Sequence, residues 1–175
     1  VMLAKLEKGH EDFDVVCPSE YIIDRMLAND MLLPIPRDFG STPDYINLVS
    51  PYVIDQFSRM DKEGKPANDY AVGYMWGTTG ILYNPEFVTD EEVDSWGIIW
   101  DDRFEGKILM KDAYRDIFGP MLMYARYQDI LDGKVTREQL MNDSSDEAIA
   151  TVENLLKAAK KNIAGWEVDF GKEMM

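Results

Sequence analysis

The segment YAVGYMWGTTGILYN, residues 70–84, constrains the fold of this chain more than any other. Its aromatic and β-branched residues are typical of an extended strand. Its glycines, Gly73, Gly77 and Gly80, permit bends or the close approach of another group to the backbone. Pro85 follows and ends the segment. A long strand near the middle of the chain predicts a crossing between two parts of the molecule.

Strand and helix patterns alternate along the chain, which predicts an α/β fold. Residues 13–17 form a short apolar run of the strand type, and we expect Cys17 to be a small buried residue at its end. A helix is predicted over residues 20–28, because Ser19 is a good N-cap and apolar residues follow at helical spacing. Strand, tight turn and helix make a βα unit.

The second half of the chain shows the same alternation. A strand is predicted over residues 106–110, and a helix over residues 112–127 that Gly119 and Pro120 interrupt or bend. Capping boxes, in which Glu or Gln follows Ser or Thr by three residues, predict further helix starts at Thr89, Thr136 and Ser144. Apolar residues of the last helix form a continuous stripe that includes Ile149 and Val152.

The charge balance is strongly acidic, with 33 acidic against 18 basic residues and a formal net charge of −15. This argues against nucleic acid and anionic lipid as partners and favours a cationic ligand, although solubility alone also explains an acidic surface. With one cysteine and one histidine, the chain has no internal disulfide and too few soft ligands for a transition-metal site. We therefore expect no cofactor and no metal.

Four segments, in order, resemble the solute-binding proteins of bacterial spermidine/putrescine uptake systems. They are FDVVCPSEYIIDRM (13–26), the pattern Y-x-V-x-Y-x-W-G-T-T-G-I within residues 70–84, WDDRFEGKILMKD (100–112) and DAYRDIF (112–118). Each pattern is common alone, whereas the ordered set is specific. The resemblance implies a periplasmic-binding-protein-like fold of type II, in which two α/β lobes close on a ligand by a hinge.

On this resemblance, residues 1–73 are part of lobe 1, and residues 74–175 are the crossing strand and most of lobe 2. Residues 4–9 are typical of the end of a helix with Gly9 as its C-cap. Relative to the family, the chain lacks the first strand of lobe 1 and the C-terminal return segments. We therefore expect an internal piece of a longer protein, with weak or no polyamine affinity of its own.

The resemblance also implies a binding site made of hydroxyl groups and carboxylates. Ser19 and Tyr21 match a Ser-x-Tyr whose hydroxyl groups contact the ligand in the family; alone, they would be a helix cap and a packing residue. Asp112 and Asp116 match acids that hold an amino group of the polyamine. They would share a helix face if Asp112 lies in the first turn, although acids at a helix N-terminus are also favoured by the dipole.

Three further residues have supporting roles. Arg115 resembles the arginine beside the family's helix acid and would orient it, although Tyr114 makes the spacing to Asp112 one residue longer than in the family's compact form. Tyr74 and Trp76 are candidates for the lining of the cleft, where aromatic faces attract cations, but large aromatic residues in a strand are more often part of the core.

The function implied is capture of polyamines, spermidine or putrescine, in an interlobe cleft for delivery to the membrane permease of an ABC importer. The location would be periplasmic or otherwise extracytoplasmic, with a lipid anchor as an alternative. Paired carboxylates also suit acid/base hydrolysis, but no motif of an enzyme accompanies them, so we expect no enzyme. A homologous binding protein for another solute and an acidic interaction domain remain alternatives. Exposed sheet edges would let copies of the chain pair.

Overall fold

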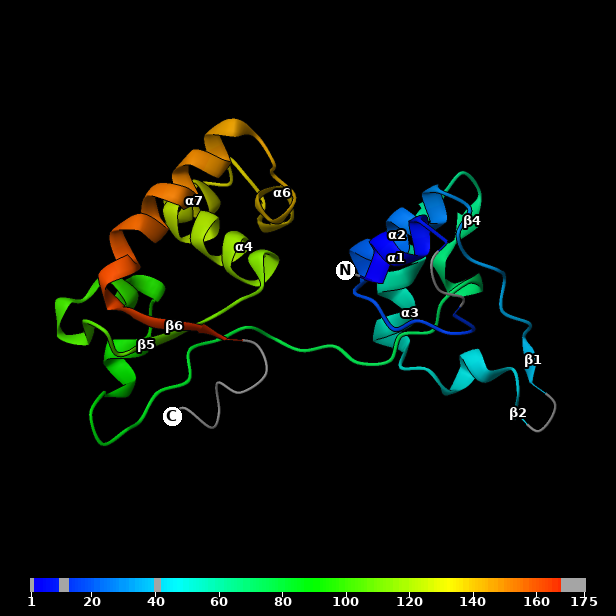
Figure 1. The fold of residues 1–175 in the computed structure, drawn as a ribbon, viewed down its shortest axis with the longest axis horizontal. Coiled ribbons are helices and arrows are strands. Elements are labelled where there is room, and N and C mark those ends of the chain that lie inside the picture. The colour runs from blue at the N-terminus through cyan, green and yellow to red at the C-terminus, as the bar shows by residue number, and fades with distance from the viewer. Residues whose placement is uncertain (1, 10–12, 40–41, 168–175) are drawn as a thin grey trace. The chain divides into compact units, whose positions relative to one another are not determined.

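The chain forms two compact units in the computed structural model, which describes residues 2–9, 13–39 and 42–167 (Figure 1). Unit 1 is Val1–Thr78 and unit 2 is Thr79–Met175. The division lies inside the segment for which a crossing was predicted. That these units are the two expected lobes stays a prediction.

Unit 1 is mainly helical. Its elements are α1 (Met2–Glu7), α2 (Glu20–Ala28), β1 (Asp38–Phe39), β2 (Thr42–Pro43), η1 (Tyr45–Leu48), α3 (Pro51–Ser58), β3 (Asp61–Lys62), β4 (Lys65–Pro66) and η2 (Ala67–Asp69). Its core brings together Ile23 and Leu27 of α2, Phe57 of α3 and Ala67 of η2. The bounds predicted for the helix over residues 20–28 are confirmed, because its apolar residues at i, i+3 and i+4 have a core to cover.

The two strands predicted in this half of the chain are wrong. Residues 13–17 and 71–84 are irregular, and Val15 and Cys17 are exposed rather than buried. An extended run becomes a strand only when a neighbouring backbone pairs with it, and in the described part of unit 1 the paired strands are the short hairpins β1–β2 and β3–β4. β-propensity without a partner strand is insufficient.

The close approach expected at a glycine of this segment is confirmed at Gly73. A Cβ atom there would overlap the Val53 side chain of α3 and lie 3.5 Å from Cε2 of Phe57, whereas a Cβ at Gly77 would meet nothing within 4 Å. The absence of a side chain therefore lets the segment pass directly over α3 at residue 73.

Unit 2 contains a parallel pair of strands and four α-helices between them in sequence. Its elements are η3 (Asp90–Val93), η4 (Trp96–Trp100), η5 (Asp102–Phe104), β5 (Ile108–Lys111), α4 (Tyr114–Ala125), α5 (Tyr127–Leu131), α6 (Arg137–Met141), α7 (Asp146–Ala159), η6 (Lys160–Asn162) and β6 (Ile163–Glu167). The strand β5 is confirmed, and β6 is a strand that the sequence analysis did not predict. Parallel strands require a long crossover, which the helices α4–α7 supply.

The register of the β5–β6 pair contains one irregularity. Ile108 pairs with Ile163, but Leu109 pairs with Gly165, so the pairing skips Ala164 of β6. After this bulge the register continues to the strand ends, where Lys111 is the partner of Glu167.

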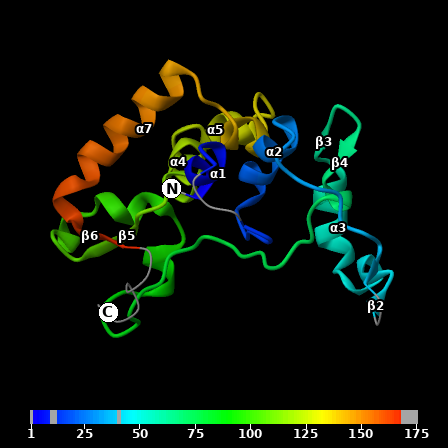
Figure 2. The same ribbon diagram turned by 45° about the vertical axis from the view of Figure 1, so that its right-hand side comes forward.

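The core of unit 2 lies beneath the crossover helices. α4 packs against α6 and α7, and Figure 1 and Figure 2 show α7 leading down to β6. The fully buried residues of this core include Met121 and Leu122 of α4 and Leu140 of α6. This packing fixes the start of α4, and with it the turn that joins β5 to α4.

Two details of the helices differ from the prediction. α4 continues through Pro120, so the predicted interruption is wrong, while the alternative of a bend there stays a prediction. A Cβ atom at Gly119 would overlap the end of the Met141 side chain, so the glycine serves helix packing. The last helix is capped by Ser145 rather than Ser144, since the Ser145 hydroxyl accepts a bond from the Ala148 N–H at 3.2 Å. Ile149, which was expected in the apolar stripe of this helix, is half exposed, whereas Val152 is buried.

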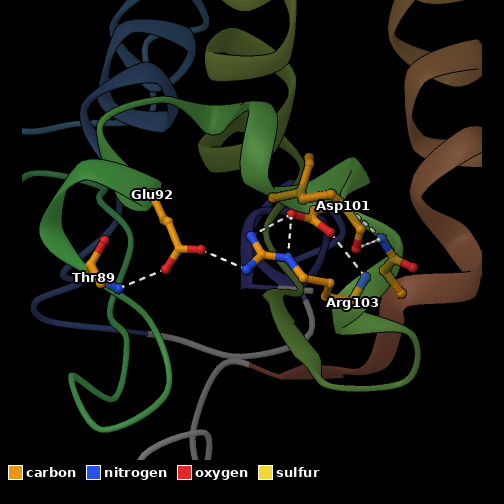
Figure 3. A network of polar contacts seen from close by, with 6 residues as sticks. Thr89, Glu92, Asp101 and Arg103 are labelled. Carbon is orange, nitrogen blue, oxygen red and sulfur yellow. Dashed lines mark hydrogen bonds and ion pairs between the residues drawn. The ribbon is translucent and has the colours of Figure 1, made fainter.

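A polar network holds together the segments that precede β5 (Figure 3). The Arg103 guanidinium pairs with both Asp101 and Glu92 at 2.6 Å, and Glu92 also accepts the Thr89 N–H at 2.9 Å, as predicted for a capping box. The pKa of Glu92 is lowered by the Thr89 N–H and then by Arg103; that of Asp101 is lowered by Arg103. The network therefore stabilises the ionised carboxylates.

A buried asparagine joins the same region to β6. The Asn162 side chain is completely buried, and its amide nitrogen donates to the carbonyl oxygens of Ile99 at 3.0 Å and Asp101 at 2.9 Å. Its own oxygen, Oδ1, is buried without a hydrogen-bond partner among the described residues. Because Asn162 immediately precedes β6, these bonds fix where that strand begins.

Candidate functional site

The turn between β5 and α4 carries both acids that the sequence analysis selected in unit 2. Asp112 directly follows β5, and its N–H donates to the Glu167 carbonyl at 3.0 Å, which extends the ladder to β6 by one bond. Asp116 lies in the first turn of α4, where its N–H donates to the Ala113 carbonyl at 3.0 Å. The carboxyl end of a strand in an open α/β fold is where ligands bind.

The expectation that Asp112 belongs to the first turn of the helix is wrong. Ala113 is the N-cap, so Asp112 lies outside the helix and Asp116 lies inside it. Asp112 is the more exposed of the two, and Asp116 is half-buried. Acidic residues are common in the first turn of a helix, where N–H groups lie without partners inside the helix. The two acids therefore flank one turn instead of lining one helix face.

The Asp116 carboxylate is already paired with an ammonium group of the chain. Nζ of Lys111, the last residue of β5, contacts Oδ2 of Asp116. The two side chains retain 49% and 37% of their exposure, so the pair is open to solvent. Asp116 thus binds a primary alkylammonium in the structure.

Two residues of this turn were missed by the sequence analysis. Lys111 could have been found, because it stands between the predicted strand and Asp112. Glu167 could not, because its place beside Lys111 depends on β6, whose Gly165 weakens the strand signal. Together with the two aspartates, Glu167 brings a third carboxylic residue to the carboxyl end of the parallel pair.

Arg115 lies on α4 next to Asp116 in sequence. Its guanidinium donates to Oδ1 of Asn142, the residue that ends α6, at 3.3 Å. This bond joins the start of α4 to α6 and supports the position of the first turn. The more specific role that the resemblance implies, orientation of the Asp116 carboxylate, stays a prediction.

The candidates in unit 1 lie at the beginning of α2. Ser19 is the N-cap, and its carbonyl accepts the Ile22 N–H at 2.9 Å, but its hydroxyl makes no capping bond to the helix. Ser19 is exposed, and Tyr21, in the first turn, is partly exposed. The cap therefore uses the backbone of Ser19, and contact of the two hydroxyl groups with a ligand stays a prediction.

The two aromatic candidates lie on the irregular segment after η2. The Trp76 ring contacts the Tyr52 ring of α3, with 5.2 Å between centroids and an interplanar angle of 46°. Trp76 is nevertheless 63% exposed, and Tyr74 is 81% exposed. Neither belongs to the core of unit 1, so the alternative of core packing is wrong for both, and their lining of a cleft stays a prediction.

The candidate residues of each unit have side chains that suit a cationic ligand with a methylene chain. Unit 2 presents Asp112 and Asp116 beside Lys111, and unit 1 presents the Ser19 and Tyr21 hydroxyl groups and exposed aromatic faces. Carboxylates bind ammonium groups by charge-assisted hydrogen bonds, and aromatic faces attract cations and pack on methylene chains. Residues 2–9, 13–39 and 42–167 contain no group of three or more His, Cys, Asp or Glu side chains suited to a metal ion.

Comparison with known proteins identifies the family. The family model of the bacterial extracellular solute-binding proteins matches residues 37–168, which is more than half of the chain. The chain belongs to this family. The resemblance seen in the sequence is confirmed, and membership of a solute-binding family agrees with the expectation that the chain is not an enzyme.

Curated relatives of this family member are named for polyamines. The chain is 29% identical over 170 residues to the spermidine/putrescine-binding periplasmic protein of Escherichia coli, covering 96% of this chain and 42% of that protein. It is 31% identical over 134 residues to the putrescine-binding periplasmic protein PotF of the same organism, covering 71% of this chain and 34% of that protein. The family member thus spans about two fifths of the first relative's length.

Solved structures agree with the fold. A spermidine/putrescine ABC transporter protein from Listeria monocytogenes matches with a TM-score of 0.78 and 26% identity, over 99% of this chain and 48% of that one. The substrate-binding protein PotD from Streptococcus pneumoniae matches with a TM-score of 0.63 and 25% identity, over 47% of its length. The family member is therefore a mixed α/β chain that matches about half of such structures. In its described part no helix is long and apolar enough to cross a bilayer.

Proposed function

We propose that the protein containing this chain is the polyamine-capturing component of an ABC importer, with a type II two-lobe fold that closes on spermidine or putrescine. Residues 1–73 would contribute to lobe 1 and residues 74–175 to lobe 2. Delivery to a membrane permease would follow closure, outside the cytoplasm. The names of the relatives support this solute class, and the family membership supports solute binding in general.

The observation that carries the proposal is the chemistry of the β5–α4 turn. Asp116 holds a primary alkylammonium there, the group found at both ends of putrescine and spermidine. Asp112 adds a second carboxylate on the other side of the N-cap, and the exposed Tyr74 and Trp76 offer apolar and cation-attracting faces. The formal net charge of −15 raises the local concentration of any cationic solute.

The test is a titration of the 15N-labelled chain with spermidine at low salt, followed by amide NMR, because this method detects weak binding. We expect weak binding, since the chain spans less than half of the relatives, with shifts at the amides of Asp112 and Asp116. The neutral analogue 1,4-butanediol has the length of putrescine without its charges, and we expect no shifts with it. Asp116→Asn should weaken polyamine binding.

Two results would count against the proposal. One is equal binding of polyamine by the wild-type chain and the Asp116→Asn variant. The other is an equal response to 1,4-butanediol, since recognition of the ammonium group is the basis of the proposal. Asp129→Asn is the matched control, because Asp129 on α5 is also an ion-paired surface acid, with Arg126 and Lys134.

A further inference from the structure

Lys111 presents to Asp116 the same chemical group that a polyamine would present. Each is a primary ammonium at the end of a methylene chain, and here the lysine's is tethered to the last residue of β5. Because Lys111 and Asp116 are both held by regular elements of unit 2, they meet wherever the turn keeps its geometry. The ammonium position at Asp116 is therefore filled by the protein itself.

We propose that Lys111 is a built-in competitor: it occupies the Asp116 carboxylate in the ligand-free chain, and an incoming alkylammonium must displace it. The inference rests on the proposed function and adds a residue that sets affinity for the ligand. The displacement exchanges one ammonium for another on the same carboxylate, so the charge at Asp116 is balanced before and after binding.

The surroundings of Lys111 allow this exchange. Its side chain is 49% exposed and has a flexible four-carbon stem, so it can leave Asp116 while β5 stays in place. Glu167 is its register partner on β6, and adjacent strands lie about 5 Å apart. A displaced ammonium therefore has a second carboxylic side chain nearby. Exposed ion pairs are weak, so the need to break the Lys111–Asp116 pair should lower the affinity for a polyamine only about two- to fivefold, relative to a chain without the pair.

Two effects of Lys111 can be separated by the choice of ligand. If Lys111 must be displaced, its removal should raise affinity by the same factor for putrescine, with two charges, and spermidine, with three. If Lys111 acts only through the long-range field, the gain should be larger for spermidine, because Coulomb repulsion grows with ligand charge. Equal gains indicate competition for one carboxylate.

The experiment compares wild-type chain with Lys111→Gln and Lys111→Arg in NMR titrations with putrescine and spermidine at low salt. We expect Lys111→Gln to bind both ligands about two- to fivefold more tightly. The arginine of Lys111→Arg keeps the charge but can donate two parallel hydrogen bonds to the Asp116 carboxylate. This variant should therefore bind putrescine and spermidine more weakly than the wild type does. Lys157→Gln is the matched control, because Lys157 pairs with Glu153 on α7 in an exposed pair of the same kind.

Unchanged or weaker binding by Lys111→Gln would overturn the inference, as would a gain that Lys157→Gln reproduces. If Asp116→Asn still weakens binding in that case, the proposed function stands and only the competitor is wrong. If binding persists in full in Asp116→Asn, the proposed site is wrong. Absence of polyamine binding by both the wild type and Lys111→Gln would overturn the competitor, since removal of Lys111 then gives no gain. It would leave the proposed function standing, because weak or absent affinity is expected of a chain that spans about two fifths of its first relative. Amide spectra of each variant verify that unit 2 keeps its fold.

Discussion

Replacing Asn162 by alanine tests how the β5–β6 pair is held in place. The Asn162 amide donates to two carbonyl oxygens of the preceding segment, those of Ile99 and Asp101, and the side chain is completely buried. Alanine removes both bonds. Asn162→Asp keeps the shape of the side chain but removes the donors and faces the two carbonyl oxygens with carboxylate oxygens. The two variants therefore separate lost bonds from introduced charge.

The expected loss follows from counting these groups. Two neutral hydrogen bonds at about 1 kcal/mol each give about 2 kcal/mol. Truncation leaves a small cavity that costs up to about 1 kcal/mol, and removal of the unpartnered Oδ1 returns about the same amount. The free energy of unfolding should therefore fall by about 2 kcal/mol in Asn162→Ala. It should fall further in Asn162→Asp at pH 7, because a charge is then buried without a partner.

The assay is urea unfolding followed by tryptophan fluorescence in a Trp76→Phe background. The three tryptophans that remain, Trp96, Trp100 and Trp166, all belong to unit 2, so the signal reports that unit. A loss of about 2 kcal/mol corresponds to a midpoint lower by about 1 to 2 M urea. The matched control is Gln128→Ala on α5, which removes an exposed bond to Oδ1 of Asp132 and should change stability by less than about 0.5 kcal/mol.

A midpoint for Asn162→Ala that equals that of Gln128→Ala would refute the reasoning. It would mean that the two carbonyl oxygens lose nothing when their donor is removed. An Asn162→Asp variant as stable at pH 7 as Asn162→Ala would refute the claim that this position is isolated from solvent.

Two further predictions concern charge and backbone contact. The two carboxylates that pair with Arg103, those of Glu92 and Asp101, have lowered pKa values in the folded state. They therefore stabilise the fold at pH values above their unfolded pKa values of about 4, and this stabilisation is lost as the pH falls through their folded pKa values. Arg103→Gln should thus lower the urea midpoint at pH 7, and below about pH 4 its midpoint should fall less steeply with pH than that of the wild type. Midpoints of the two proteins that fall in parallel with pH would contradict this. Gly73→Ala should reduce the free energy of unfolding by about 1 to 3 kcal/mol, and so lower the melting temperature, because the new methyl group meets Val53. Gly77→Ala should leave the melting temperature unchanged, because a Cβ atom there meets nothing within 4 Å. Equal melting curves for the two variants would show that the approach of residue 73 to Val53 is unimportant for stability.

Local signals in the sequence were enough for several helices. The bounds of α2 follow from Ser19 and from apolar residues at helical spacing, and the Thr136 capping box makes both of its bonds, at 2.8 and 3.1 Å. These features are decided by residues within one or two turns of each other. No knowledge of distant partners is needed to place them.

Features that depend on distant partners were not predictable in the same way. Residues 70–84 have strand-forming composition, but no described segment pairs with them, whereas the less strand-like residues of β6 do pair, with β5. Similarly, Pro120 usually interrupts a helix, but packing of Gly119 against Met141 accompanies an unbroken α4. In each case tertiary context overrides local propensity.

The candidate site was predictable in part. The motif around Asp112 and Asp116 led to the β5–α4 turn, because strand, turn acid and helix acid follow one another in sequence. Lys111 was visible there but was not weighed as a partner for Asp116. The position of Glu167 beside Lys111 depends on the parallel pairing of β5 with β6, which are separated in sequence by the whole crossover. No local sequence pattern predicts a pairing between segments so far apart.

The skipped residue in β6 has a consequence for the chemistry at the end of the strand. In an uninterrupted register Lys111 would have Trp166 alongside it, and the omission of Ala164 from the pairing moves the indole back to Met110. One inserted alanine thus exchanges an aromatic neighbour for an acidic one at the lysine. The gain or loss of one residue in β6 therefore decides whether Lys111 lies beside a carboxylic side chain or an indole.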